Sequence, residues 1–134
     1  MLSEIKLKLN KIDIELRKCE IMTFHDLVPW SEVMAWKVGE IKNISGSRNE
    51  LIYREENIFI FETIIPPKVV FSYHWHDFNE HNFIVTGLYK DDNSTKESGE
   101  WVGYPPFIPH EVLNPSETEH LKTIVIFTKE KAKK

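Results

Sequence analysis

The sequence predicts an all-β domain, built as a sandwich or barrel of short strands. Two observations support this fold class. Short runs rich in β-branched and aromatic residues recur from residue 37 onward, and all but the last end near proline, glycine, asparagine or aspartate. No interior segment shows a convincing 3.6-residue apolar period of a helix. A length of 134 residues suits one domain with a core of its own.

The first twenty residues fit two different structures. Leu2, Ile5 and Leu9 are spaced by three and four, as on an amphipathic helix, but Leu7 would then lie on the opposite face. As extended chain, Ile5, Leu7 and Leu9 alternate cleanly. We favour the strand and leave the helix open. A strand with no partner in its own barrel can pair with a second copy, so we expect a homodimer.

The rest of the chain divides into a covering segment and a series of strands. We interpret residues 23–36 as a short turn-rich segment that covers one end of the barrel. We assign residues 1–50 to an N-terminal extension with the first strands of the barrel and residues 51–134 to the core, within one structural domain. The predicted strands are Lys37–Ile44, Leu51–Arg54, Ile58–Ile65, Val69–His76, Asn82–Tyr89, Gly99–Tyr104, Val112–Leu113 and His120–Thr128.

The composition excludes several classes of function. A net charge of -4 argues against nucleic acid as a partner, since such proteins present a basic face. Cys19 is the single cysteine, which excludes an internal disulfide framework and fits a reducing compartment. Neither a signal-type leader nor a membrane-length apolar run is present. We therefore expect a cytoplasmic protein that binds neither membrane nor nucleic acid.

The most informative stretch is His74-Trp75-His76, followed by Glu80 and Gly87. Side chains two apart on a strand lie on the same face, so both imidazoles point the same way. Glu80 keeps that parity if the chain turns back soon after His76. Two imidazoles and a carboxylate on one face are suitable ligands for a divalent metal ion.

A second stretch supplies one more imidazole. Gly99, Pro105, His110 and Asn114 form the pattern Gly-x5-Pro-x4-His-x3-Asn. His110 lies in a proline-bounded turn that leads into a strand, which places it about thirty residues beyond Glu80. The candidate metal ligands are therefore His74, His76, Glu80 and His110.

Together the two stretches resemble the motifs of the cupin superfamily, Gly-x5-His-x-His-x3,4-Glu-x6-Gly and Gly-x5-Pro-x-Gly-x2-His-x3-Asn. Two positions depart from them, because Lys68 and Phe107 stand where the motifs have glycine. Glycine at such positions serves tight turns, so its replacement affects the shape of the loops rather than the metal ligands. The resemblance covers residues 51–128 and implies a double-stranded β-helix, or jelly roll, with a metal inside one end of the barrel. Zinc-binding anti-sigma-factor sensors and diketone-cleaving dioxygenases are among the similar small single-domain cupins.

The identity of the metal stays open between Fe, Mn, Ni and Zn. Three imidazoles and a carboxylate leave two open positions on an octahedral ion, where substrate or O2 can enter. A tetrahedral zinc ion would be satisfied by the four ligands alone, with little room for catalysis.

Strand parity also predicts the wall around these ligands. Its residues are aromatic or apolar with few charges, which favours a compact and weakly polar ligand. No dedicated general base stands out, and Tyr104 and His81 are weak candidates for that catalytic role. The predicted wall residues are Phe61, Thr63, Asn82, Ile84, Tyr104, Phe107, Val112 and Ile126.

Three functions fit these residues. The first is a mononuclear-metal dioxygenase, an oxidoreductase that acts on a small oxygen-bearing organic substrate. The second is a zinc-binding sensor or ligand-binding module without catalysis. The third is a metal-dependent isomerase. We favour the first slightly, because the residues before the core show no evident helical adaptor for a sensor's partner.

Overall fold

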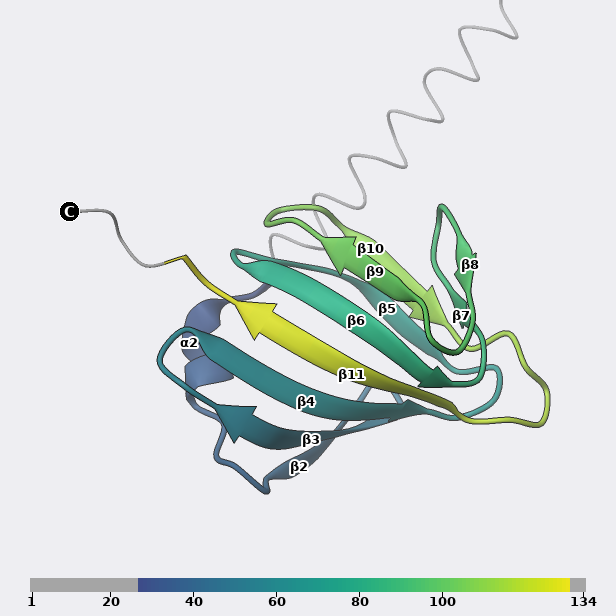
Figure 1. Ribbon diagram of the computed structural model, residues 1–134, viewed down its shortest axis with the longest axis horizontal. Helices are drawn as coiled ribbons and strands as arrows, with labels where there is room; N and C mark the ends of the chain where they lie inside the picture. The colour runs from purple at the N-terminus through teal and green to yellow at the C-terminus, as the bar shows by residue number, and fades with distance from the viewer. Residues whose placement is uncertain (1–26, 131–134) are drawn as a thin grey trace, which may run out of the picture.

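A computed structural model describes residues 27–130 of the chain. Residues 1–26 and 131–134 lie outside this range, and so do both interpretations of the first twenty residues and the dimer contact predicted through them. Two sheets face each other and close into a barrel (Figure 1). Within the described residues, no helix is long and apolar enough to cross a membrane.

The strands divide into a sheet of five and a sheet of six, and β1 runs parallel to β5 while all other pairs are antiparallel. This arrangement confirms the predicted all-β jelly roll. The five-stranded sheet, in spatial order, is β1 (Leu27–Val28), β5 (Val70–His76), β10 (His110–Leu113), β7 (Tyr89–Lys90) and β8 (Thr95–Lys96). The six-stranded sheet is β2 (Ile41–Ile44), β3 (Ser47–Arg54), β4 (Ile58–Ile65), β11 (Leu121–Thr128), β6 (Asn79–Thr86) and β9 (Trp101–Tyr104).

The centre of the larger sheet is the pairing of β4 with β11, which extends over the full length of both strands. Burial alternates along each strand. Phe59, Phe61 and Thr63 of β4 are buried, as are Thr123 and Val125 of β11, while the residues between them are half-buried. Because side chains alternate faces along a strand, these buried positions form the inner wall of the barrel.

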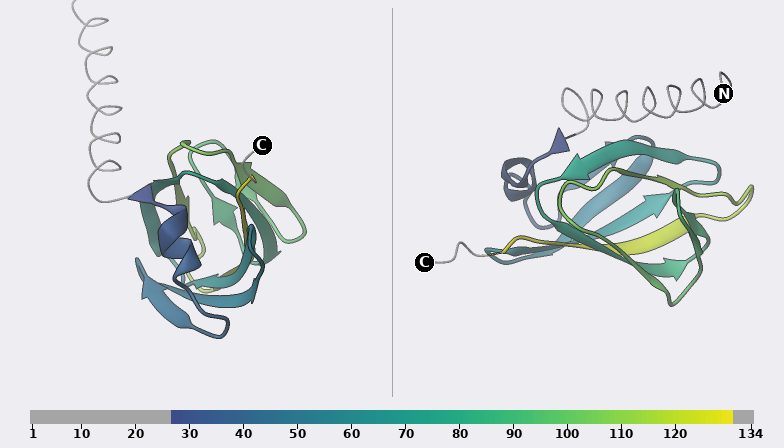
Figure 2. Two further views of the ribbon diagram at one scale, coloured as in Figure 1. Left: turned by 90° about the vertical axis from the view of Figure 1, so that its left-hand side faces the viewer. Right: turned by 90° about the horizontal axis from the view of Figure 1, so that it is seen from above.

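A short helix, α2 (Trp30–Met34), covers one end of the barrel (Figure 2). It follows Pro29, and the backbone N–H of Trp30 donates to the carboxylate of Asp77 at 3.0 Å. Trp30 and Val33 are buried against aromatic residues of the barrel. The sequence predicts a covering segment here but not the helix, because five residues are too few to show a helical period.

The predicted strand boundaries agree best with the observed ones where the flanking turn residues are most distinctive. The strand Ile58–Ile65 has the predicted bounds, and Val70–His76 differs by one residue. β6 begins at Asn79, three residues earlier than predicted, and a separate strand β7 follows it. β3 crosses residue 51, where the sequence places the start of the core, and the division at that residue stays a prediction.

The core consists of two clusters of buried residues. One lies at the α2 end, and the other gathers where β6, β9 and β10 meet the end of β4 and the start of β11. The first contains Trp30, Val33, Trp36, Leu51, Phe59, Phe61, Phe78 and Val125, and the second contains Ile65, Ile84, Tyr89, Tyr104, Val112 and Leu121.

Candidate metal centre

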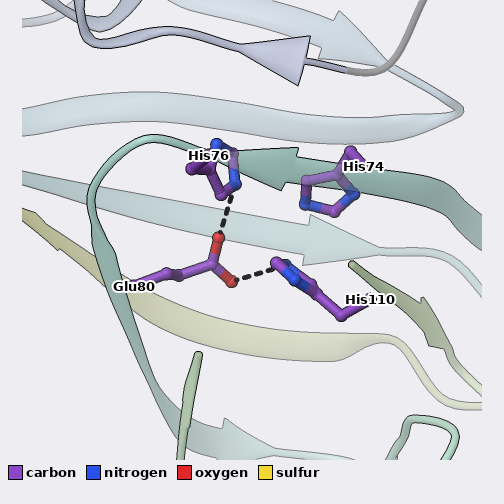
Figure 3. Close-up of side chains that lie close together, drawn as sticks. All are labelled: His74, His76, Glu80 and His110. Atoms are coloured by element: carbon purple, nitrogen blue, oxygen red, sulfur yellow. Dashed lines mark ion pairs between the residues drawn. The ribbon is translucent and has the colours of Figure 1, made fainter. Parts of the chain in front are cut away.

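The four predicted ligands come together inside the barrel. β5 supplies His74 and His76, β6 supplies Glu80 and β10 supplies His110. Each offers one ligand atom, and these atoms all lie within 4.8 Å of one another. All four side chains are buried and converge on one point (Figure 3). The group has the composition and spacing of a site that could hold one metal ion.

The orientation of two imidazoles is fixed by backbone carbonyls. Nδ1 of His76 lies 3.2 Å from the carbonyl oxygen of Val28, and Nδ1 of His110 lies 3.1 Å from that of Ile108. A carbonyl only accepts, so each Nδ1 carries the hydrogen, and in the neutral ring Nε2 holds a lone pair. The two Nε2 atoms lie 2.9 and 3.4 Å from the carboxylate oxygens of Glu80.

This arrangement requires a positive charge. Apart from that carboxylate, the buried Nε2 atoms of His76 and His110 have no partner among the described residues. Lone pairs that face a carboxylate repel it unless a proton or a metal ion lies between them. The donor set therefore fits a divalent cation bound through Nε2 and carboxylate oxygen, with Nδ1 held as in many histidine metal sites.

The carboxylate is held in its charged form. Burial alone would raise the pKa of Glu80, but His110 and His76 outweigh burial and hold that pKa well below its ordinary value. Conversely, burial would lower the pKa of His110, and the charge of Glu80 raises it instead. The side-chain amide of Asn82 also donates to Oε2 of Glu80 at 2.7 Å, which fixes the carboxylate from the second side.

Tyr104 supports His110 from behind. The two rings stack in parallel with their centroids 3.8 Å apart. The Tyr104 hydroxyl lies 2.6 Å from the hydroxyl of Tyr89 and donates to Asp91 at 2.7 Å. Burial raises the pKa of Tyr104, so this phenol stays protonated. These contacts make Tyr104 a group that positions His110.

A cavity of about 120 Å³ extends from the metal group into the barrel. His74, His76 and Glu80 form part of its wall, and most of the remaining wall is aromatic or aliphatic, as the sequence predicts. Its other wall residues are Val28, Val33, Trp36, Ile44, Asn49, Phe61, Thr63, Ile65, Phe71, Asn82, Tyr89, Val112, Thr123, Val125 and Phe127.

Of the eight predicted wall residues, the structure places four at this cavity: Phe61, Thr63, Asn82 and Val112. All four are buried. They belong to β4, β6 and β10, along which burial alternates, so their even or odd position in the strand places them on the inner face.

The predictions for Phe107 and Ile126 are wrong. Phe107 is 61% exposed, and its ring packs at 5.5 Å against Trp75 on the outside of the barrel. Ile126 lies between two residues of the cavity wall, Val125 and Phe127, and therefore faces the other side of β11. Because residues 124–127 are all apolar, alternation could not identify the inner face there.

The other three candidates lie close to the site but not on the cavity wall. Ile84 is fully buried in the second core cluster. Tyr104 lies behind His110, as described above. His81 is exposed on the outer face, opposite Gly103 of β9, so it is not placed to act as a base.

Several residues of the cavity wall were not predicted from the sequence. Asn49 and Thr123 are polar residues at inward positions of β3 and β11, flanked two residues away by the buried Leu51 and Val125. The charged residues Arg48 and Glu50 on either side of Asn49 are the signal that could have identified it, whereas the apolar run 124–127 gives no such signal for Thr123. Tyr89 could not be found in this way, because β7 has only two residues.

The two motif positions that lack glycine keep the backbone shape of glycine. Lys68 has φ +63° and Phe107 has φ +65°, both in the left-handed region. The backbone N–H of Phe107 donates to the carbonyl of His76 at 2.8 Å, which ties this turn to the strand of the ligands. The loops are therefore retained at the cost of some backbone strain.

No family model matches this sequence, and no curated protein matches it either. Solved structures do match. An RmlC-like cupin from Shewanella frigidimarina is 15% identical with a TM-score of 0.61, over 69% of this chain and 86% of that one. A predicted oxalate decarboxylase from Thermotoga maritima is 16% identical with a TM-score of 0.58, over 69% and 93%.

A third match is to the structure of Rhodobacter sphaeroides SigE in complex with the anti-sigma ChrR. It is 14% identical with a TM-score of 0.59, and the match covers 71% of this chain and 51% of that one. Identities this low establish a shared fold rather than a shared activity. The chain has the cupin fold, as the resemblance of its motifs implies.

Proposed function

We propose that this protein is a metal-dependent cupin enzyme of the mononuclear dioxygenase type. Its substrate would be a small, weakly polar organic molecule that bears oxygen. One observation carries the proposal: the buried Nε2 lone pairs of His76 and His110 face the carboxylate of Glu80 at 2.9 and 3.4 Å, beside an apolar cavity.

His74, His76, Glu80 and His110 would hold the ion. When bound, a redox-active divalent metal such as Fe(II) supplies Lewis acidity toward an oxygen-bearing substrate and electrons for reaction with O2. The protein's own part is positional. Asn82 fixes the carboxylate of Glu80, and the carbonyls of Val28 and Ile108 fix the imidazoles.

The cavity wall supports an organic substrate. Among the described residues, Glu80 and the histidines are the only side chains of the Asp, Glu, His, Lys or Arg type in this wall, and aromatic rings such as Phe61 and Phe127 cover much of it. A wall of this kind excludes water and favours a neutral carbon skeleton over a phosphate or a multiply charged acid.

The two alternatives differ from this proposal in what they require of the cavity. A sensor with a closed four-ligand zinc site needs no space beside the metal. A cavity of about 120 Å³ that reaches three of the four ligands favours a function in which a small molecule binds there. A metal-dependent isomerase would use the same space, and O2 consumption distinguishes it from a dioxygenase.

The test combines metal analysis with oxygen uptake. The protein is loaded with Fe(II) without oxygen and then mixed with O2 and small diketones, beginning with pentane-2,4-dione. We expect substrate-dependent O2 consumption in the wild type and in His81→Ala, whose side chain faces outward. We expect none in His76→Ala. Equal consumption in His76→Ala, or bound metal without O2 consumption for any substrate, would contradict a dioxygenase.

A further inference from the structure

The cavity has a second polar region that the metal group does not explain. Asn49, Thr63 and Thr123 lie side by side on three neighbouring strands, because Asn49 of β3 pairs with Thr63 of β4, and Thr63 pairs with Thr123 of β11. All three line the cavity, and they are 7%, 5% and 1% exposed. We call these three residues the polar row.

The hydroxyls of the polar row differ in the hydrogen bonds that they can still offer to a ligand. The Thr63 hydroxyl donates to Oδ1 of Asn49 at 2.8 Å, and the amide of Asn49 donates to the hydroxyl of Ser47 at 3.0 Å. The Thr63 oxygen therefore keeps only lone pairs for a ligand. Within the described part of the chain, the Thr123 hydroxyl has no side-chain hydrogen bond, and it can donate as well as accept.

The polar row and the metal group lie at opposite parts of the cavity. Phe127 pairs with Glu80, and Thr123 lies four residues away on the same strand, roughly 13 Å at the usual rise of a strand. Phe61 and Val125 pair with each other in the region between and present apolar surface. Asn82 also pairs with Val125, but its amide donates to Glu80, so it belongs to the metal end. The cavity is thus polar at two ends, with mainly apolar surface between them.

Thr123 lines the cavity, and a hydroxyl that faces an otherwise apolar space is stabilised when a ligand or water bonds to it. No charged side chain accompanies the polar row, so a charged ligand group would find no counter-charge there. A neutral hydroxyl fits, because it can donate to the lone pairs of Thr63 and accept from Thr123. The cavity of about 120 Å³ is close to the size of an engineered cavity of about 150 Å³ that holds benzene.

We propose that the polar row is a second anchoring site for the substrate and that it binds a neutral hydroxyl group. The substrate is then a compact molecule, about as large as one six-membered ring, with an oxygen at the metal end and a hydroxyl at the far end. The assignment of the metal end rests on the proposed function, whereas the hydroxyl site stands on the polar row alone.

The test uses phenol and toluene, which have the same shape and differ by a hydroxyl in place of a methyl group. Binding to the metal-free full-length protein is measured by titration with detection by NMR. Thr63→Val and Thr123→Val remove each hydroxyl without changing side-chain size. We expect each variant to lower the ratio of phenol affinity to toluene affinity by about fivefold, as for one lost hydrogen bond.

Two controls isolate the hydroxyls. Thr63→Ser keeps the hydroxyl and should keep the wild-type ratio, and Thr86→Val changes an exposed threonine and should also leave it unchanged. If Thr63→Val unfolds because Asn49 loses its partner, Thr123→Val carries the test, since it leaves that bond intact. An unchanged ratio in the folded valine variants, or no binding of either compound to the wild type, would overturn the proposal.

Metal content of the same preparations separates this proposal from the proposed function. A wild-type protein that binds no metal but shows the threonine-dependent ratio would refute the metal enzyme and support the hydroxyl site. A protein that binds metal through His110 but shows no threonine-dependent ratio would refute the hydroxyl site alone.

Discussion

Nε2 of His76 lies 2.9 Å from Oε1 of Glu80, although the two residues belong to different strands. The turn between β5 and β6 brings them together, and its Asp77 binds both the start of α2 and Lys129 near the end of β11. The metal group is therefore held by contacts from several parts of the barrel.

Asn82→Ala should weaken metal binding by roughly tenfold to a hundredfold. The amide of Asn82 donates to Oε2 of Glu80 at 2.7 Å, so its loss frees the carboxylate to rotate. Competition with a chelator of known affinity measures the change. Asn43→Ala, at an exposed position of β2, is the matched control. Equal affinities in the two variants would show that the amide does not position the ligand.

Gly87→Ala and Gly99→Ala should differ sharply in stability. Both glycines have a left-handed backbone, with φ +92° and +89°, so alanine costs about 1 kcal/mol at either position. At Gly87 a Cβ would also lie 2.7 Å from the carbonyl oxygen of His120, whereas at Gly99 it meets nothing within 4 Å.

We therefore expect Gly87→Ala to lower the free energy of unfolding by about 1–3 kcal/mol more than Gly99→Ala does. Urea unfolding at equilibrium measures both losses. Equal losses would mean that the contact with His120 relaxes without cost.

Lys68→Gly should stabilise the fold by about 1 kcal/mol, because φ at Lys68 is +63° and glycine removes the strain of that conformation. The ion pair of Lys68 with Glu117 is exposed and 3.9 Å long, so little is lost with it. Lys90→Gly, in β7 and outside the left-handed region, should instead destabilise by about 0.5–1 kcal/mol. A destabilised Lys68→Gly protein would show that the loop is not strained.

Asp91 should contribute to stability above its ordinary pKa of 3.8 and lose that contribution at lower pH. Burial alone would raise the pKa of Asp91, but hydrogen bonds from Tyr104, Asn93 and Ser94 outweigh burial and lower that pKa. The charged form is thus favoured in the folded protein. Stability is lost as pH falls through the lowered pKa.

The melting temperature, followed from neutral pH to about pH 3, should fall less steeply in Asp91→Asn than in the wild type. Glu97→Gln, at an exposed position, should keep the wild-type slope. If the melting temperature of Asp91→Asn fell with pH as steeply as that of the wild type, the charged Asp91 would not contribute to stability.

Simple periodicity predicts the all-β class and the shared face of the first metal ligands, whereas the resemblance to the cupin motifs implies the jelly roll and the second motif adds His110 to the group. His74 and His76 share a face at a spacing of two, and Ile58–Ile65 is a β-branched and aromatic run between clear turns. The structure differs from the prediction where the sequence shows neither a clear period nor a motif. Ile126 lies in a run that is apolar on both faces, and α2 is too short to show a period.

The exposure of Phe107 could not be predicted from the sequence for a different reason. Its exposure depends on a left-handed backbone at a position where the motif has glycine, and a side chain on such a backbone points in a direction that strand parity does not give. The contact between the Tyr104 ring and His110 likewise joins β9 to β10, which no spacing within one strand predicts.

The most direct test of the metal centre is elemental mass spectrometry of protein purified without added ions, on the wild type and His110→Ala. We predict about one equivalent of a divalent transition metal per chain in the wild type and a large loss in the variant, with the fold intact by circular dichroism. Iron, manganese or nickel would favour the open site of an enzyme. Absence of metal from the wild type, or equal metal in His110→Ala, would contradict the assignment of these residues as ligands.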